Sequence, residues 1–151
     1  MTPFDSARAR LEGHIDRQGM KHTRQRVQIL EVFISARHVT VEELLRAVQE
    51  AAPATGAATV YRTLKLFVEA GIAHERNFGD GQARYELAMD DEHHDHLICL
   101  DCKVIFEFEE QEIESCQAVV ASRHGLTLRS HRHEIYGSCD LREACPRWPA
   151  S

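Results

Sequence analysis

Ten consecutive residues, 93–102, constrain this chain more than any other segment. They read His-His-Asp-His-Leu-Ile-Cys-Leu-Asp-Cys and place three imidazoles, a carboxylate and a Cys-x-x-Cys motif in one short stretch. A second cysteine pair, Cys139 and Cys145, follows after the 36 residues 103–138. Two cysteine pairs with this spacing are typical of a structural zinc site, in which four thiolates hold the ion tetrahedrally. The sequence therefore predicts a metal-binding protein.

The histidines of this run divide between two faces. An apolar stretch follows them, which places residues 93–99 on or next to a strand. Because successive side chains of a strand point to opposite faces, His94 and His96 point one way. His93 and Asp95 point the other way. The run is therefore suited to two centres with mixed nitrogen and oxygen donors, which suit Fe(II), Mn(II), Co(II) or Zn(II); the alternative is a solvated histidine-rich loop.

Length and composition limit the class of protein. A chain of 151 residues can bury one ordinary core or two small ones. It has no run of about 18 apolar residues and no basic-then-apolar start, which predicts a cytoplasmic protein without a membrane partner. In that compartment cysteines bind metal or remain free thiols. The fifth cysteine, Cys116, falls with Ile113 and Val120 at helical spacing, which predicts a buried core thiol.

Charge is distributed unevenly along the chain. Residues 1–89 contain 12 Lys or Arg and 11 Asp or Glu, a net charge of +1; residues 90–151 contain 6 and 13, a net charge of −7, and the two add to −6. Six of the ten histidines also lie in the second segment. An acidic half can serve solvation alone, but bound divalent cations would neutralise much of this charge.

The first half predicts helices followed by a two-stranded wing. Residues of about 4–18 form an amphipathic helix that ends at Gly19, and Thr23 is placed to cap a second helix. Strands at 72–78 and 83–87 flank a Gly-Asp-Gly turn.

Two more helices lie between the second helix and the wing. Thr40 and Glu43 form a Thr-x-x-Glu capping box for a helix that runs through about Ala51. The next helix lies between Thr55 and Gly71, and Gly71 is its C′ glycine.

Helices followed by a wing indicate a winged helix-turn-helix that reads DNA. The last helix offers aromatic, hydroxyl and guanidinium groups, which can meet thymine methyls, base edges and phosphates in the major groove. A basic cluster before the second helix suits backbone or minor-groove contact. The candidate DNA contacts are Lys21, Arg24, Arg26, Thr59, Tyr61 and Arg62. The alternative is a helical protein-interaction domain on which these are ordinary solvated faces.

Six ordered blocks of sequence carry a family resemblance. They are Gly-Met-Lys-His-Thr-Arg-Gln-Arg at 19–26, His-Val-Thr-Val-Glu-Glu-Leu at 38–44, Ala-Thr-Val-Tyr-Arg at 58–62, Arg-Tyr-Glu-Leu at 84–87, the run at 93–102, and Tyr-Gly-Ser-Cys at 136–139. With these blocks the chain resembles the ferric uptake regulator (Fur) superfamily of bacterial metal-dependent transcription regulators. The resemblance implies an α+β fold with a winged-helix domain at 1–87, a hinge at 88–92 and a metal-binding α/β dimerisation domain at 93–151.

The resemblance also implies three sets of metal ligands. The structural zinc ligands are Cys99, Cys102, Cys139 and Cys145. The regulatory site consists of His38, Glu86, His94, His96 and Glu107. An additional site consists of His93, Asp95, Glu114 and His131. The implied metals are Zn²⁺ at the cysteines and Fe²⁺ or Mn²⁺ at the regulatory site, where Zn²⁺ or Co²⁺ can substitute in vitro.

The implied function is an Fe(II)-responsive repressor of iron-uptake genes, a switch rather than an enzyme. Bound metal locks a homodimer, or a dimer of dimers, into a form that binds an A·T-rich pseudo-palindromic operator in double-stranded DNA. Tyr61 is expected at thymine methyls, Arg62 at phosphate or a base edge, and Lys21 in the minor groove.

Several alternatives remain open at this level. The peroxide-sensing branch carries aspartates where this chain has Glu86 and Glu107, whereas a manganese-responsive member would look almost identical; zinc and nickel sensing are also compatible with these ligands. A metal store or chaperone would need no recognition helix. The chain departs from the family pattern in the longer spacing between Cys139 and Cys145 and in an extra residue before the histidine run. His133 matches no site position, but it shares a strand face with His131 and is a substitute-ligand candidate.

Overall fold

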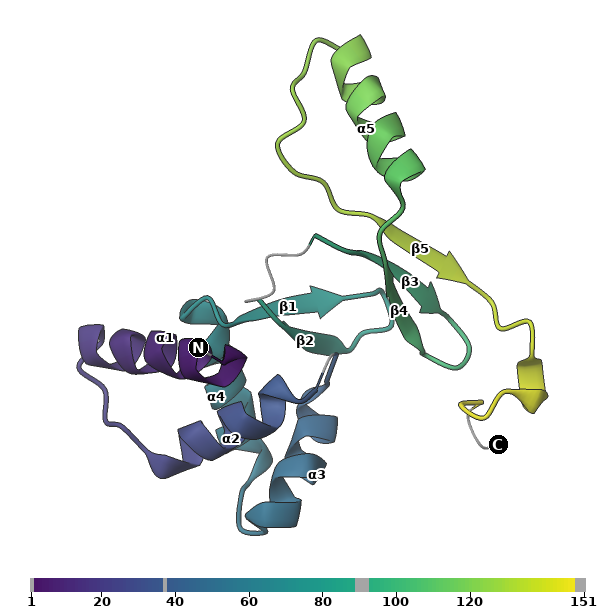
Figure 1. The fold of residues 1–151 in the computed structure, drawn as a ribbon. Helices are drawn as coiled ribbons and strands as arrows, with labels where there is room; N and C mark the ends of the chain where they lie inside the picture. The colour runs from purple at the N-terminus through teal and green to yellow at the C-terminus, as the bar shows by residue number, and fades with distance from the viewer. Residues whose placement is uncertain (1, 37, 89–92, 149–151) are drawn as a thin grey trace. The chain divides into compact units, whose positions relative to one another are not determined.

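The computed structural model describes residues 2–36, 38–88 and 93–148. The chain divides into two compact units, Met1–Asp91 and Glu92–Ser151 (Figure 1). Of the hinge expected at 88–92, only Ala88 falls within the described residues.

Four helices form most of the first unit, and local capping explains where three of them begin. They are α1 (Pro3–Arg17), α2 (Arg24–Ile34), α3 (Val41–Ala51) and α4 (Ala57–Glu69). Thr2 and Thr40 each form a complete capping box, with Asp5 and Glu43 respectively, and the Thr23 hydroxyl accepts the third amide of α2. These side chains satisfy amide donors that have no partner within a helix. The predicted caps at Thr23 and Thr40 are confirmed.

The apolar faces of the four helices meet in one core. Nine helical side chains in this core are completely buried: Ala7, Leu11, Ile29, Leu30, Phe33, Leu44, Val60, Leu64 and Phe67. Because the apolar face of α4 is buried in this core, the opposite face of the helix remains available for a ligand.

A two-stranded wing follows α4. Gly71 adopts a φ of +67° and ends the helix, after which β1 (Ala73–Asn77) pairs antiparallel with β2 (Ala83–Leu87). Gly79 and Gly81 in the turn have φ values of +83° and +79°, a region that glycine enters without steric cost. The wing predicted from the Gly-Asp-Gly signal is confirmed.

The second unit is built on a three-stranded sheet. Its elements are β3 (Asp95–Cys99), β4 (Ile105–Phe108), α5 (Gln111–Arg123), β5 (Glu134–Gly137) and the short 3-10 helix η1 (Arg142–Ala144). The strand order is β4-β3-β5, with β3 antiparallel to β4 and parallel to β5. The central strand is the one that carries the predicted metal ligands.

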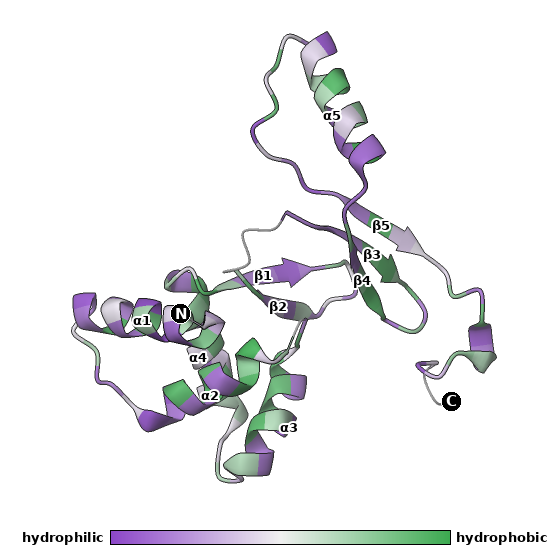
Figure 2. Cartoon of the chain, in the orientation of Figure 1, coloured by the Kyte–Doolittle hydropathy of each residue, from purple (hydrophilic) through white to green (hydrophobic). Residues whose placement is uncertain are grey.

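Much of the apolar surface of the second unit is uncovered within a single chain. Figure 2 shows hydrophobic stretches on β3 and β4, and the cross-strand neighbours Leu97, Phe106 and Ile135 are all exposed. Helix α5 has no buried residue, and Cys116 is exposed. The prediction of a buried Cys116 is therefore wrong, because the helical spacing identified an apolar stripe that no element among the described residues of the second unit covers.

No helix in the described ranges is long and apolar enough to cross a membrane. The mixed helix-and-sheet architecture expected from the sequence is confirmed.

Candidate metal centres and nucleic-acid interface

Three cysteines of the second unit converge at the ends of β3 and β5. The Sγ atoms of Cys99, Cys102 and Cys139 lie within 4.8 Å of one another, and none of the cysteines forms a disulfide. Sulfurs around a tetrahedral zinc ion with Zn–S bonds of about 2.3 Å would be roughly 3.8 Å apart, so this group is compatible with zinc. Cys145 is buried in the same hydrophobic cluster, although its sulfur is not one of the three in the 4.8 Å group.

The backbone around the cysteines is arranged to hold thiolates. A backbone hydrogen bond from Cys102 lowers the pKa of the Cys99 thiol below its ordinary value, with a further contribution from the amide of Asp101. The Asp101 carboxylate accepts the amide of Cys139 at 2.7 Å and so ties the two cysteine segments together. Lys103 closes the turn with a φ of +62°, which is unusual for a residue with a side chain. A thiol with a lowered pKa is a better metal ligand, because the thiolate is the coordinating form.

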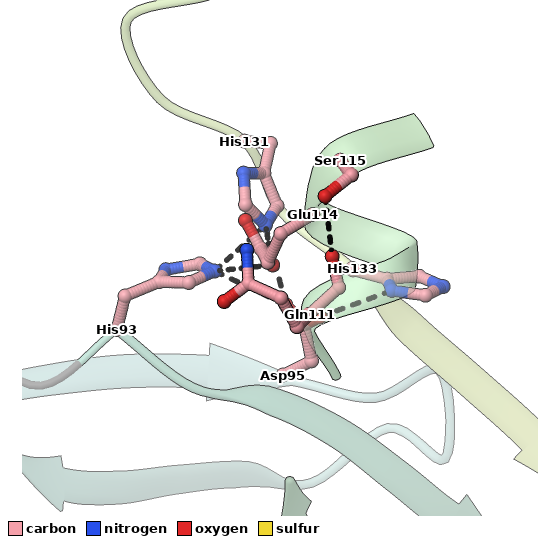
Figure 3. A network of polar contacts seen from close by, with 7 residues as sticks. All are labelled: His93, Asp95, Gln111, Glu114, Ser115, His131 and His133. Carbon is pink, nitrogen blue, oxygen red and sulfur yellow. Dashed lines mark hydrogen bonds and ion pairs between the residues drawn. The ribbon is translucent and has the colours of Figure 1, made fainter. Parts of the chain in front are cut away.

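A second cluster joins β3, α5 and the segment before β5. It consists of His93, Asp95, Glu114 and His131 (Figure 3). The two imidazole Nε2 atoms are 2.7 Å apart. Asp95 Oδ1 is 3.4 Å from each of them, and Glu114 Oε1 is 3.4 Å from His93 Nε2 and 3.1 Å from His131 Nε2. Two nitrogens and two oxygens therefore face a common centre.

The donor set of this cluster fits a first-row metal ion. Ligand atoms about 2.0–2.1 Å from a tetrahedral ion are roughly 3.3–3.4 Å apart, close to most of the separations in the cluster. Asp95 Oδ1 and Glu114 Oε1 are buried and accept no hydrogen bond from the described residues. Buried carboxylate oxygens are costly without a partner, and a cation at the centre would satisfy both.

The first unit contributes a buried carboxylate–imidazole pair. Glu86 on β2 places Oε2 at 3.2 Å from His38 Nδ1, and its other oxygen, Oε1, accepts a hydrogen bond from Arg76 Nε at 2.6 Å. The β1–β2 register pairs His74 with Glu86, so Arg76 reaches the carboxylate diagonally across the wing. Arg76 is not predicted from the sequence, in which its only signal is a cation on the strand that pairs with the strand of Glu86.

The remaining predicted regulatory ligands lie together on the second unit. The His94 and His96 rings have centroids 5.0 Å apart, and His94 Nε2 is 3.9 Å from Glu107 Oε1. His96 and Glu107 are cross-strand partners in β3 and β4. Asp95, between the two histidines, belongs to the other cluster, as the alternation of side chains along a strand requires.

The predicted DNA contacts lie on α4, in the first turn of α2 and in the segment before α2. Tyr61 and Arg62 are exposed, Thr59 is half-buried, and the Lys65 ammonium lies 5.5 Å from the Tyr61 ring centroid. This cation–π contact orients the aromatic ring on the outer face of the helix.

Arg24 and Arg26, expected before the second helix, lie in the first turn of α2, and Arg26 holds the basic segment that leads into this helix. Arg26 Nη1 donates to the Lys21 carbonyl at 2.6 Å, so Arg26 shapes the segment that presents Lys21. Lys21 and Arg24 are exposed. This segment and α4 both belong to the first unit, so their cations can contact the phosphates of one DNA duplex.

Comparison with known proteins places these features in a family. The model of the ferric uptake regulator family matches residues 17–136. The ferric uptake regulation protein of Yersinia pestis is 42% identical over 124 residues, which cover 81% of this chain and 83% of that protein.

Solved structures agree with the family match. The Helicobacter pylori ferric uptake regulator, reported to have three functional metal-binding sites, superposes with a TM-score of 0.83 at 30% identity over 91% of both chains. A zinc-bound manganese uptake regulator superposes with a TM-score of 0.71 at 42% identity, over 85% of this chain and 98% of that one. Together with the winged-helix unit and the donor clusters, these matches show that the chain belongs to the ferric uptake regulator family of metal-responsive transcription regulators.

Proposed function

We propose that this protein is an Fe(II)-responsive repressor of iron-uptake genes in which metal couples the DNA-binding unit to the dimerisation unit. The observation that carries the proposal is that the five predicted regulatory ligands form two groups, one in each unit. His38 and Glu86 form a pair in the first unit. His94, His96 and Glu107 form a group in the second.

In this proposal the five regulatory ligands act together. Ligands on both units that share one ion hold the units in one relative orientation, with residues 88–92 as the hinge. The ion supplies only positive charge and coordination bonds. Metal favours the conformation that binds DNA because that conformation binds the ion more tightly than the other conformations do. The size of the shift equals this difference in metal affinity. A coupling free energy of about 1–3 kcal/mol would change DNA affinity roughly 5- to 150-fold, and DNA would tighten metal binding by the same factor.

The other two clusters have separate roles in this proposal. The cysteines bind structural zinc, with Cys145 as the fourth ligand. The cluster of His93, Asp95, Glu114 and His131 binds an additional divalent ion, which neutralises part of the acidic second unit. Neither role requires catalysis.

Regulators of this family bind DNA and form dimers. We propose that the uncovered apolar surface of the second unit buries itself against a second copy of the chain, in the cytoplasm. A twofold dimer presents two copies of α4 to successive major grooves, which suits an A·T-rich pseudo-palindromic operator. Lys21, Arg24 and Arg26 contact the backbone or minor groove, and Thr59, Tyr61 and Arg62 contact the major groove.

The test is anaerobic fluorescence anisotropy with a labelled duplex from upstream of the gene for this protein. Fe(II) and Mn(II) are titrated against zinc-loaded, otherwise metal-free protein at constant salt, because affinity for DNA depends on salt. Tight binding is expected only with added metal, and His94→Ala should weaken it. If no metal promotes binding to that duplex or to a randomised duplex pool, the switch is rejected and a metal store or chaperone gains support.

A manganese-responsive regulator is the second candidate. The observation in its favour is the 42% identity with a manganese uptake regulator, of which this chain covers 98%. The same titration separates the two when each midpoint is compared with the free concentration of that metal in the cell, because availability rather than raw affinity selects the physiological effector. Glutamates at 86 and 107, rather than the aspartates of the peroxide-sensing branch, weigh against peroxide sensing.

A further inference from the structure

His133 lies beside Asp95 because of the parallel pairing between β3 and β5. That pairing aligns His96 with Glu134, and the amide of His96 donates to the carbonyl of His133 at 3.1 Å. Extended by one residue, the register places His133 next to Asp95, with both side chains on the same face of the sheet. Two residues 38 positions apart in sequence thereby become neighbours.

The contact between these residues involves the carboxylate oxygen that faces away from the imidazole pair. His133 Nδ1 lies 3.1 Å from Asp95 Oδ2, whereas Oδ1 faces His93 and His131 (Figure 3). One oxygen of this buried carboxylate therefore faces the cluster, and the other contacts His133. Because His133 is not in the group of four donors, its position does not fit the role of a substitute ligand.

The His133 ring is itself held in place. Phe108, the cross-strand partner of Asp95, packs edge-on against it with ring centroids 5.9 Å apart and an interplanar angle of 73°. The hydrogen bond from the His96 amide to the His133 carbonyl fixes the backbone position of His133 beside β3. On another side, His133 lines a shallow, solvent-open groove of about 620 Å³ along α5, together with Cys116 and Gln117. An imidazole with a fixed position can fix the carboxylate to which it is bonded.

We propose that His133 is a positioning residue for the additional metal centre. By donating from Nδ1 to Asp95 Oδ2, it fixes the carboxylate so that Oδ1 points at the centre of the cluster. The inference rests on the proposed metal-binding role of His93, Asp95, Glu114 and His131. Hydrogen bonds of this kind orient metal ligands, and their loss typically costs 10- to 100-fold in metal affinity.

The experiment is an anaerobic Co(II) titration of the zinc-loaded, full-length protein, followed by d–d absorption and by competition with a chromophoric chelator. The part of the spectrum that His131→Ala removes is assigned to the cluster. His133→Leu and His133→Gln should weaken that component 10- to 100-fold and change its band positions. His133→Asn should restore both, because the Asn amide nitrogen occupies nearly the place of Nδ1. Zinc content and circular dichroism check the fold, and His124→Leu, at the exposed end of α5, is the matched control.

Three results would overturn the inference, and they differ from one another. If His131→Ala removes a cobalt component that His133→Leu and His133→Gln leave unchanged, the metal centre stands and the role of His133 is rejected. If His131→Ala removes no component, the metal-binding role of the cluster is itself rejected, and the inference about His133 falls with it. Loss in all three His133 variants, without rescue by Asn, would also contradict a role that depends on the Nδ1 donor.

Discussion

Arg76 and Glu86 form a hydrogen-bonded ion pair within the wing, with Nε 2.6 Å from Oε1 and the carboxylate almost completely buried. The second oxygen of the same carboxylate faces His38 Nδ1 at 3.2 Å. The DNA-binding unit thus holds one proposed regulatory ligand in place through a cation on the neighbouring strand.

Replacing Arg76 by Leu should destabilise metal-free protein more than metal-loaded protein. The substitution leaves a buried carboxylate without its guanidinium, a loss on the order of 1–3 kcal/mol, and a metal ion at Glu86 would offset part of the lost positive charge. The measurement is thermal unfolding with and without Mn(II). Arg46→Leu is the control, because the Arg46–Glu42 pair is 72% and 71% exposed and should contribute little. Equal shifts of Tm in the two states would contradict the proposed role of Glu86 as a metal ligand.

Replacing Cys102 by Ser should release zinc and unfold the second unit. The cluster contains few apolar residues besides the cysteines, and structural zinc sites contribute folding free energy directly. Zinc content and circular dichroism provide the measurement, and a strong chelator should have the same effect on the unmodified protein. Cys116→Ser should change neither quantity, since Cys116 is exposed on α5 and lies outside the group of sulfurs. Retention of one equivalent of zinc by Cys102→Ser would refute the assignment.

Two exposed residues of α4 should affect DNA binding without affecting stability. Arg62→Ala should reduce the slope of log affinity against log salt by about 0.9 if Arg62 neutralises one phosphate. Tyr61→Ala should weaken binding roughly tenfold, the equivalent of about 1.4 kcal/mol, with little change in salt slope. Surface substitutions of this kind usually change stability by less than about 0.5 kcal/mol. Arg123→Ala in the second unit is the control; an equal effect there would indicate non-specific charge rather than a recognition helix.

The stability of the wing should depend on pH through the ionisation of Asp80. Two hydrogen bonds from Arg84, at 2.7 and 3.0 Å, hold the pKa of the Asp80 carboxyl below its ordinary value. The pKa of Asp80 is lower in the folded protein than in the unfolded chain, where it is about 3.9. Its ion pair therefore contributes fully to stability above that unfolded pKa, and the contribution is lost as pH falls through the folded pKa. Asp80→Asn should therefore cost on the order of 1–2 kcal/mol near neutral pH and progressively less in acid.

Carbon-detected NMR of the Asp80 carboxyl provides the measurement for the wing. Its midpoint should lie below that of an ordinary aspartate, and Arg84→Leu should move it upward. An unchanged midpoint in that variant would exclude Arg84 as the cause.

Lys103→Gly should stabilise the cysteine turn. Lys103 has a φ of +62°, a conformation that costs a residue with a Cβ roughly 1–2 kcal/mol and costs glycine almost nothing. The loss of the Lys103 Nζ hydrogen bond to the Leu100 carbonyl offsets only a small part, because exposed bonds contribute little. The measurement is thermal unfolding of the zinc-loaded protein, in which Tm should rise; a fall would show that the side chain, not the backbone, dominates the turn.

Local signals in the sequence accounted for most of the first unit. The caps at Thr23 and Thr40, the glycine at 71 and the Gly-Asp-Gly turn involve residues at most a few positions apart, so their physical meaning is contained in the sequence. Alternation along β3 separated His93 and Asp95 from His94 and His96 for the same reason.

Contacts between distant segments required the tertiary structure. The diagonal pair of Arg76 and Glu86 depends on the register of the wing, and the contact of His133 with Asp95 depends on parallel pairing across 38 positions. Cys116 is exposed although its helical spacing predicted burial, because burial depends on which surface covers a stripe. The sequence by itself determined which residues can cap, turn, alternate and bind metal, since those properties are local. Only the tertiary structure decided which of them meet, because strand register and packing bring together side chains that no local interaction connects.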